Sequence, residues 1–290
     1  MDVRELSTRG MYVFELISME KLPLREWPEN SEEILLGVLN DASAEESNRL
    51  LAAELAGELP ASTDELAGAL LSIVRSGDEP GELRARAAMA LGPTLEYAYL
   101  SDFEDPDEET ITQGMFLKIK ESLHELYLDG TVPEEVRRKI LEGSVRAPDE
   151  WHRDAVRAAY VSEKDNWRLT AVFCMRYVKG FEDQVPEALR SEDPDMLYEA
   201  VSAAGNWHLD DAWPRLTALL DSDETDRDVL FAAIETVTEI RPREAGVVLV
   251  DLADSKDEEI AEAATELRCW WRIFRTTSTS TMNNQSPGGN

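Results

Sequence analysis

Apolar residues recur at helical spacing along most of the chain, and between residues 165 and 267 the pattern itself repeats. Four segments there open on a polar or acidic residue followed by an apolar one, and each places an alanine four residues after that apolar position. The alanines lie 29, 33 and 31 residues apart and are Ala171, Ala200, Ala233 and Ala264. About thirty residues hold two helices of roughly three turns and two short connections, so this period predicts stacked helical hairpins.

The unit that begins near residue 193 shows how the pattern sets the helices. Asp193 is the expected N-cap, with Pro194 at the first helical position. Gly205-Asn206 is expected to end this helix, and a second one is expected over 210–220. Small alanines on the packed face let neighbouring helices approach closely. A single hairpin cannot bury both of its faces, so the units must stack.

The same register extends upstream of residue 165. Glu82-Leu83-Arg84 leads to Ala87, and the stretch continues as Ala87-Ala88-Met89-Ala90-Leu91-Gly92. This segment resembles the HEAT and HEAT-like repeat family, which includes the repeats named after phycobilisome lyases. The resemblance covers residues 31–267 and implies an all-α fold: a right-handed α-solenoid, or superhelix, of about six or seven stacked antiparallel helical hairpins.

The arginine of the motif is absent from the later units. Leu197, Leu230 and Ala261 stand at its position in the units that begin at 195, 228 and 259. A ladder of interactions made by that arginine is therefore not predicted for the C-terminal half.

The repeat register also predicts the domain organisation. Residues 1–30 do not match the repeat and are expected to cap it, residues 31–275 form the repeat solenoid, and residues 276–290 form an uncharged flexible tail. Ala87 and Ile140 lie 53 residues apart, which is about twenty more than one period. The excess predicts an insertion at 93–113.

The insertion combines aromatic and acidic residues. Residues 101–109 contain six acids and no base, and Tyr97, Tyr99 and Phe103 precede or interrupt them. An extended loop packed on the adjacent helices is the simplest interpretation, and a recognition loop for a basic partner is the sharper one, because insertions in repeat proteins often map to the binding face. A calcium site is a third interpretation, although the EF-hand glycine and terminal glutamate are missing.

Residues 134–176 have a different charge balance, with nine bases and eight acids. Trp151-His152-Arg153-Asp154 opens a helix there, on which Arg153 and Arg157 share one face. The resemblance implies that the second helix of each hairpin lines the concave surface, and we assign this helix to that class. The alternative is that these arginines are solvated and pair with acids of neighbouring repeats. The candidate partner-binding residues are Tyr97, Tyr99, Phe103, Trp151, His152, Arg153 and Arg157, and we hypothesise that the acidic loop folds over the two arginines and gates access to them.

The overall charge narrows the choice of partner. The chain has 60 acids and 29 bases, a net charge of -31, which argues against nucleic acid and disfavours anionic membranes. It favours a basic protein partner or a setting of high salt. The sequence predicts no membrane span, and Cys174 and Cys269 are not spaced for a metal site or a disulfide network, so the expected location is the cytoplasm.

No catalytic constellation is visible in the sequence. Some HEAT-like proteins are di-iron hydroxylases that need several His-Glu pairs on facing helices, and only His124-Glu125 matches here. No catalytic, metal or cofactor-binding residue is predicted. The predicted function is a non-catalytic protein–protein interaction scaffold that uses the concave face and the acidic-aromatic insertion. The alternative is a lyase- or chaperone-like component that uses the concave groove for a cofactor or a substrate protein, and the oligomeric state is left open.

Overall fold

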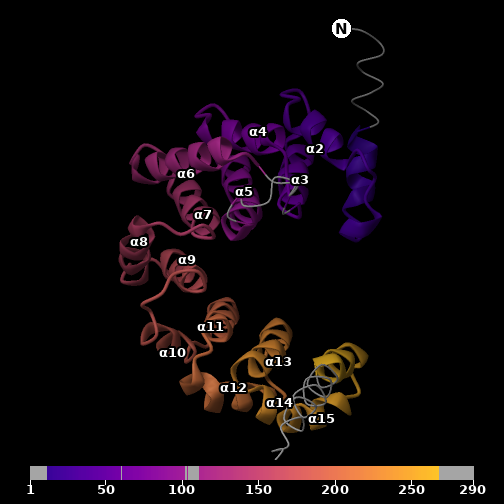
Figure 1. The fold of residues 1–290 in the computed structure, drawn as a ribbon, viewed down its shortest axis with the longest axis vertical. Helices are drawn as coiled ribbons and strands as arrows, with labels where there is room; N and C mark the ends of the chain where they lie inside the picture. Colours follow the sequence, from indigo (N-terminus) through magenta and orange to yellow (C-terminus); the bar gives the residue numbers. More distant parts are fainter. Residues whose placement is uncertain (1–11, 60, 102, 104–110, 268–290) are drawn as a thin grey trace, which may run out of the picture. The chain divides into compact units, whose positions relative to one another are not determined.

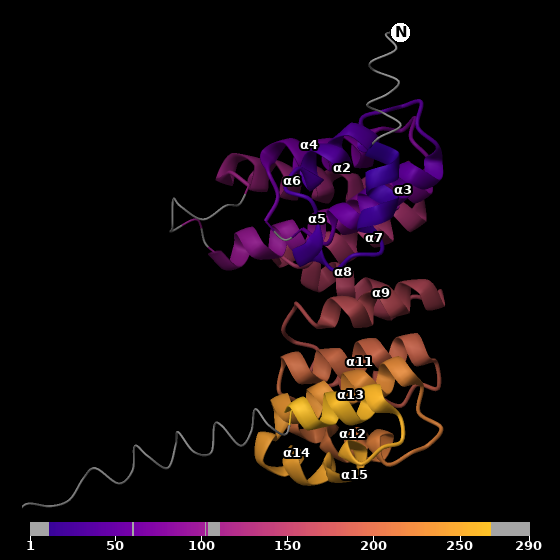
Figure 2. The same cartoon turned by 90° about the vertical axis from the view of Figure 1, so that its right-hand side faces the viewer.

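The computed structural model describes residues 12–59, 61–101, 103 and 111–267. All regular elements in this part of the chain are helices. The chain divides into two compact units, Met1–Val161 and Ser162–Asn290. Each unit is a stack of paired helices, as the sequence predicts (Figures 1 and 2).

The first unit is built from two rows of helices. One row contains α3, α5 and α7, in which each helix packs against its neighbour, and the other row contains α2, α4 and α6 in the same arrangement. Each helix of the row α2, α4 and α6 also pairs with the next helix in the chain. Residues 12–19 are also helical. The bounds are η1 Leu24–Glu26, α2 Ser31–Leu39, α3 Glu46–Ala56, α4 Asp64–Arg75, α5 Gly81–Ser101, α6 Gln113–Leu128, α7 Glu134–Ser144 and α8 Glu150–Tyr160.

The second unit repeats this arrangement. α9, α11 and α13 pack side by side, while α10 packs against α11, and both α12 and α14 pack against α13. A further helical stretch covers residues 258–267. The bounds are α9 Asp165–Met175, α10 Gln184–Ala188, α11 Pro194–Asn206, η2 Asp210–Ala212, α12 Trp213–Leu220, α13 Arg227–Ile240, α14 Pro242–Val248 and α15 Val250–Ala253.

The repeated alanines form the packed positions of the second unit. Ala171, Ala200, Ala233 and Ala264 are each 0% exposed, which confirms their predicted burial. The expected pairing of 195–204 with 210–220 was wrong, because α11 pairs with α10, and α12 pairs with α13. Periodicity gives the length of a repeat but not the residue at which it begins, so the pairing is shifted by one helix.

Replacing Ala233 by Phe should destabilise the second unit. The alanine lies on α13, which packs against both α11 and α12, and a ring there has no space to occupy. Overpacking of this kind costs ~1–3 kcal/mol in the free energy of unfolding, which urea denaturation would measure. Ala158→Phe, at an exposed position of α8, is the matched control. Equal stability of Ala233→Phe and the parent protein would show that the packing is wrong.

Polar contacts between neighbouring repeats join residues that lie about one repeat period apart in the sequence. Arg49 donates two hydrogen bonds of 2.7 Å to Glu79, 30 residues away, and Arg241 donates two of 2.6 Å to Asp210, 31 residues away. The Trp207 indole donates to the Met175 carbonyl, 32 residues away, at 2.6 Å. These contacts fix the register of one helix pair on the next.

The motif arginine has a second role in the first unit. Arg49 and Arg84 are buried, and their guanidinium groups donate to the carbonyl oxygens of Leu39 and Val74 near the end of the preceding helix. A helix leaves its last carbonyls without intrahelical partners, so this contact satisfies them. Leu197 and Leu230 are buried apolar residues at the equivalent positions of the second unit. The arginine ladder therefore does not continue there, as the substitutions indicate.

The insertion differs from the expected loop. α5 runs without interruption through Pro93 to Ser101, so residues 93–101 are helical. Thr94, Leu95 and Ala98 are buried, and this apolar face continues the packing of α5 beyond the proline. The interpretation of 93–113 as one loop was wrong for this half. The acids at 102 and 104–109 lie outside the described residues. The recognition loop, the calcium site and the gate that were predicted from these acids therefore also lie outside them.

Candidate functional site

The candidate residues of the insertion and of α8 meet along one helix, α6. Phe116, Lys120 and His124 follow one another at intervals of four residues, so their side chains share a face of that helix. We call the set Tyr99, Phe103, Phe116, Lys120, His124 and Trp151 the α6 surface. Tyr127 also contributes, one turn beyond His124.

At one end, the α6 surface holds the aromatic residues of the insertion. The Phe103 ring packs edge-on against Phe116, with 5.4 Å between the ring centroids. Lys120 Nζ lies 5.1 Å from the centroid of the Phe116 ring and 6.0 Å from that of Tyr99. Tyr99 is 46% exposed, and the adjoining Leu100 and Leu117 are 74% and 50% exposed. This end therefore presents the Tyr99 ring and two leucine side chains to solvent beside a lysine.

At the other end, the α6 surface holds the start of α8. The Trp151 ring stacks on His124, with centroids 4.5 Å apart and planes 11° apart, and lies 5.1 Å from the Tyr127 ring. Lys120 Nζ forms an ion pair of 2.8 Å with Asp149, the N-cap of α8. Lys120 thus lies between the aromatic residues of the insertion and the start of α8, since it contacts Tyr99 on one side and Asp149 on the other.

His152 belongs to the interior rather than to this surface. It is 1% exposed, its Nε2 lies 3.0 Å from Ser144 Oγ, and its Nδ1 accepts the Asp149 backbone N–H at 2.9 Å. Burial lowers the pKa of His152 to about 4, so the ring is neutral at pH 7. Its role is to start α8 as part of a capping box with Asp149. We therefore leave His152 out of the α6 surface.

Arg153 and Arg157 are exposed on α8, two and six residues after Trp151. Arg157 Nη1 lies 3.4 Å from Asp154 Oδ1 on the same helix, and the structure shows no ion pair between Arg153 and another described residue. Trp151 and Asp149 contact α6, so the start of α8 lies beside α6, which is the first helix of its own pair. The prediction that α8 is the second helix of its pair was therefore wrong, for the same reason as the shifted pairing.

The residues that sequence reasoning missed are those of α6. Phe116, Lys120 and His124 show the four-residue spacing of a helical face in the sequence, which could have been noticed. Their importance depends on which helices flank α6, and the spacing alone does not show that. Tyr97, the remaining candidate, is half-buried on α5.

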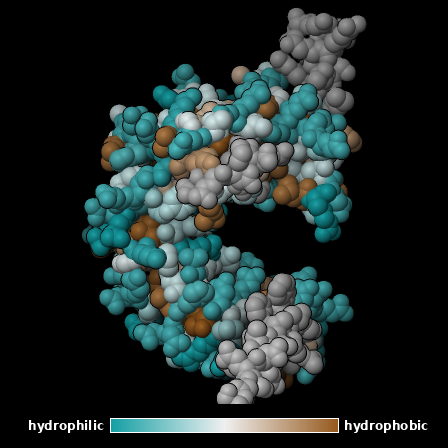
Figure 3. All heavy atoms as spheres, in the orientation of Figure 1, coloured by the Kyte–Doolittle hydropathy of each residue, from teal (hydrophilic) through white to brown (hydrophobic). Residues whose placement is uncertain are grey.

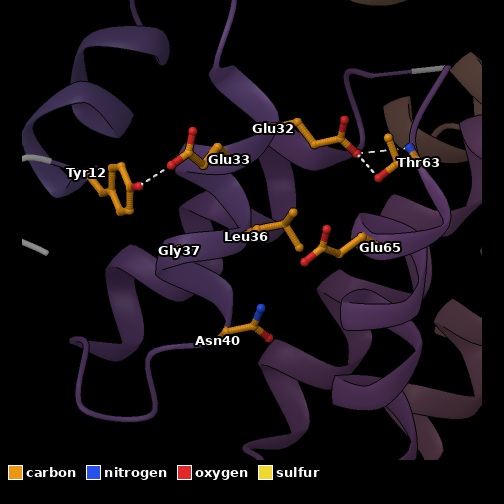
Figure 4. Close-up of a pocket in the computed structure, with 8 residues that line it drawn as sticks. All are labelled: Tyr12, Glu32, Glu33, Leu36, Gly37, Asn40, Thr63 and Glu65. Atoms are coloured by element: carbon orange, nitrogen blue, oxygen red, sulfur yellow. Dashed lines mark hydrogen bonds between the residues drawn. The ribbon is translucent and has the colours of Figure 1, made fainter. Parts of the chain in front are cut away.

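A separate groove in the first unit lies between α2 and α4. It has a volume of about 440 Å³ and is lined by Tyr12 and by Glu32, Glu33 and Glu65 (Figure 4). Two of its acids are engaged by the protein itself. Tyr12 Oη donates to Glu33 at 2.7 Å, and the Thr63 backbone N–H donates to Glu32 at 2.9 Å. The hydrogen bond to Glu33 raises the pKa of Tyr12.

Comparison with known proteins agrees with this architecture. Residues 182–268 match the family model described as HEAT repeats. This segment of the second unit contains HEAT repeats. The match covers α10 to α15 and the helical stretch that follows, so the HEAT repeats here are the stacked pairs of the second unit.

Two solved structures show a weaker likeness to the chain. Human deoxyhypusine hydroxylase in complex with glycerol is 16% identical, with 93% of this chain and 97% of that one covered and a TM-score of 0.40. An engineered protein is 17% identical, with 85% and 98% covered and a TM-score of 0.32. None of the curated proteins matches the sequence.

Two further features are absent from the described residues. No three His, Cys, Asp or Glu side chains among them are grouped so as to hold a metal ion. No helix in those ranges has the length and apolar character needed to cross a membrane. Hydrophilic residues cover most of the face shown in Figure 3, as the composition leads one to expect.

Proposed function

We propose that this HEAT-repeat chain is a non-catalytic scaffold that binds a protein partner, and that the α6 surface with Arg153 and Arg157 is a contact site. The observation that carries the proposal is the series of aromatic rings along α6, in which Tyr99 is exposed and Phe103 and Trp151 are partly exposed. Tyr99 and Trp151 present large, rigid side chains, and residues of this kind contribute most of the affinity at protein interfaces.

The charge of the chain supports a basic partner. A net charge of -31 attracts positively charged proteins and speeds their association. The acids of 101–109 adjoin the α6 surface in the sequence and add to this attraction. The wider proposal keeps residues 1–30 as a cap, 31–275 as the solenoid and 276–290 as a tail, with a cytoplasmic location.

The triple variant Tyr99→Ala, Leu100→Ser and Leu117→Ser should lose partner binding and keep the fold, because all three side chains are exposed and none of the changes alters the charge that a basic partner meets. A loss of about tenfold in affinity corresponds to ~1.4 kcal/mol, which is typical of removing one anchor residue. Affinity capture from lysate with quantitative mass spectrometry, followed by titration of the captured protein, would measure it.

The matched control is Val247→Ser, an equally exposed position on α14 of the second unit. Unchanged capture by the triple variant would count against the α6 surface. A coloured cofactor or a tightly bound metal that purifies with the chain would favour the alternative, a lyase- or chaperone-like component.

A further inference from the structure

A second groove lies between α11 and α13 in the second unit. Its volume is about 390 Å³. Acids and aromatic rings from both helices line it: Asp195 and Tyr198 of α11, the α13 N-cap Asp226, and Asp228, Phe231 and Glu235 of α13. Positions 228, 231 and 235 fall on one face of α13, so the groove is about 10 Å long at 1.5 Å per residue.

The carboxylates of this groove differ in whether they accept hydrogen bonds from the protein itself. Asp226 caps α13 and accepts the backbone N–H groups of Asp228 and Val229. No hydrogen bond or ion pair joins the Asp195, Asp228 or Glu235 carboxylate to another described residue. Acids in a first helical turn suit the helix dipole, which explains Asp195 and Asp228. It does not explain Glu235, which lies two turns further along.

The next repeat shows what such a groove holds. Arg227, the first residue of α13, donates to Asp257 at 2.6 Å and also to Glu259. Its guanidinium lies 5.2 Å from the centroid of the Phe231 ring. The guanidinium is thus held by two acids at the start of the following helix and by a ring on its own helix.

The groove between α11 and α13 is the counterpart of that site, one repeat earlier. Asp226 corresponds to Asp257, because both accept two backbone N–H groups at the start of a helix. Asp228 then corresponds to Glu259, 31 residues on, and Tyr198 corresponds to Phe231, 33 residues on. These intervals equal those between the buried alanines.

The two sites have an acid pair and a ring in common and differ in the cation. The residue that corresponds to Arg227 is Pro194, since each is the first residue of its helix. The earlier groove therefore has the acids and the ring that hold a guanidinium, and a proline where the arginine would start.

We propose that the groove between α11 and α13 binds an arginine side chain of a partner protein, in the place that Arg227 fills from within the chain in the next repeat. This inference rests on the proposed scaffold function and specifies which kind of partner side chain the groove binds. Arginine is favoured over lysine because a planar guanidinium can bond two carboxylates and stack on the Tyr198 or Phe231 ring at the same time.

The test uses the full-length chain and a short peptide with one arginine, beside the same peptide with lysine or with citrulline, its neutral isostere. Affinity should fall in the order arginine, lysine, citrulline, and should weaken as salt rises. Pro194→Arg should fill the groove from within and weaken binding of the arginine peptide about tenfold, as expected for loss of a charge-assisted contact. Pro194→Ala removes the ring of the proline without adding a cation and should bind as the parent does.

A second variant guards against a folding defect at the helix start. Asp228→Asn with Glu235→Gln leaves the first helical position untouched and should weaken the arginine peptide to a similar extent. Equal binding of the arginine and citrulline peptides, or parent-like binding by both the Pro194→Arg and the Asp228→Asn, Glu235→Gln proteins, would overturn the inference.

The inference and the proposed function can fail separately. If partner capture depends on the α6 surface while Pro194→Arg binds the arginine peptide normally, the scaffold stands and the groove is not the arginine site. If Pro194→Arg blocks the peptide while the triple variant captures its partner normally, the groove is confirmed and the α6 surface is not the contact.

Discussion

Gly143→Ala should destabilise the first unit by about 3 kcal/mol or more, at the upper end of overpacking effects. Gly143 lies near the end of α7, where that helix packs against α5. A Cβ at this position would lie less than 3.0 Å from the Ala88 carbonyl oxygen and 3.1 Å from its carbon. The obstacle is backbone inside a helix, so no side-chain rotation can relieve the clash, and the two helices must move apart.

Gly68→Ala is the matched control. Gly68 lies inside α4, and a Cβ there would meet only the end of the Met115 side chain, at 3.5 Å. Alanine is the better helix former by ~0.5–1 kcal/mol, so this variant should be slightly more stable than the parent. Urea denaturation of the two variants should therefore give changes of opposite sign. A Gly143→Ala protein as stable as Gly68→Ala would mean that α5 and α7 do not approach this closely.

The contrast between Gly143 and the repeated alanines shows how far the sequence predicts this fold. The repeat period identifies Ala200 and Ala233 in the sequence, and both are buried. Gly143 lies outside that series, and its neighbour Ala88 is 55 residues away in the sequence. Position 143 requires glycine because the backbones of two helices are in contact there. The residue pattern of one helix carries no information about such a contact.

The contact sites were predictable to different degrees. Tyr99, Phe103 and Trp151 could be selected from the sequence as exposed or packing aromatic residues, but their common neighbour Lys120 depends on α6 lying beside both the end of α5 and the start of α8. The repeat spacing placed an insertion at 93–113, but α5 continues through Pro93 because Thr94, Leu95 and Ala98 are buried. Local rules identify the residues, and packing decides which of them meet.

His152 should make the first unit sensitive to acid. The ring is 1% exposed, and loss of hydration on burial lowers its pKa from 6.5 to about 4. Protonation would also end the acceptor role of Nδ1, which now receives the Asp149 backbone N–H. Both effects favour the neutral ring in the folded state, whereas the unfolded chain protonates near pH 6.5.

The sign of the pH dependence follows from these two values. Because the folded pKa lies below the unfolded one, the unfolded state binds the proton first, and the neutral ring stabilises the fold fully above about pH 6.5. That contribution is lost as the pH falls from about 6.5 to 4, and a gap of roughly 2.5 pKa units makes the loss ~3 kcal/mol at most. Below pH 4 the folded state also protonates, and this residue adds no further loss.

A comparison with His152→Gln isolates this effect from the titration of the acids. The glutamine variant keeps a polar side chain at the start of α8 and cannot gain a proton in this range. The free energy of unfolding of both proteins would be measured in urea at pH 7.0, 5.5 and 4.0. The parent should lose ~3 kcal/mol more than the variant between the first and last of these values. Parallel curves for the two proteins would mean that the His152 ring can be protonated within the fold at little cost, so that Ser144 and Asp149 do not hold it in a neutral, desolvated site.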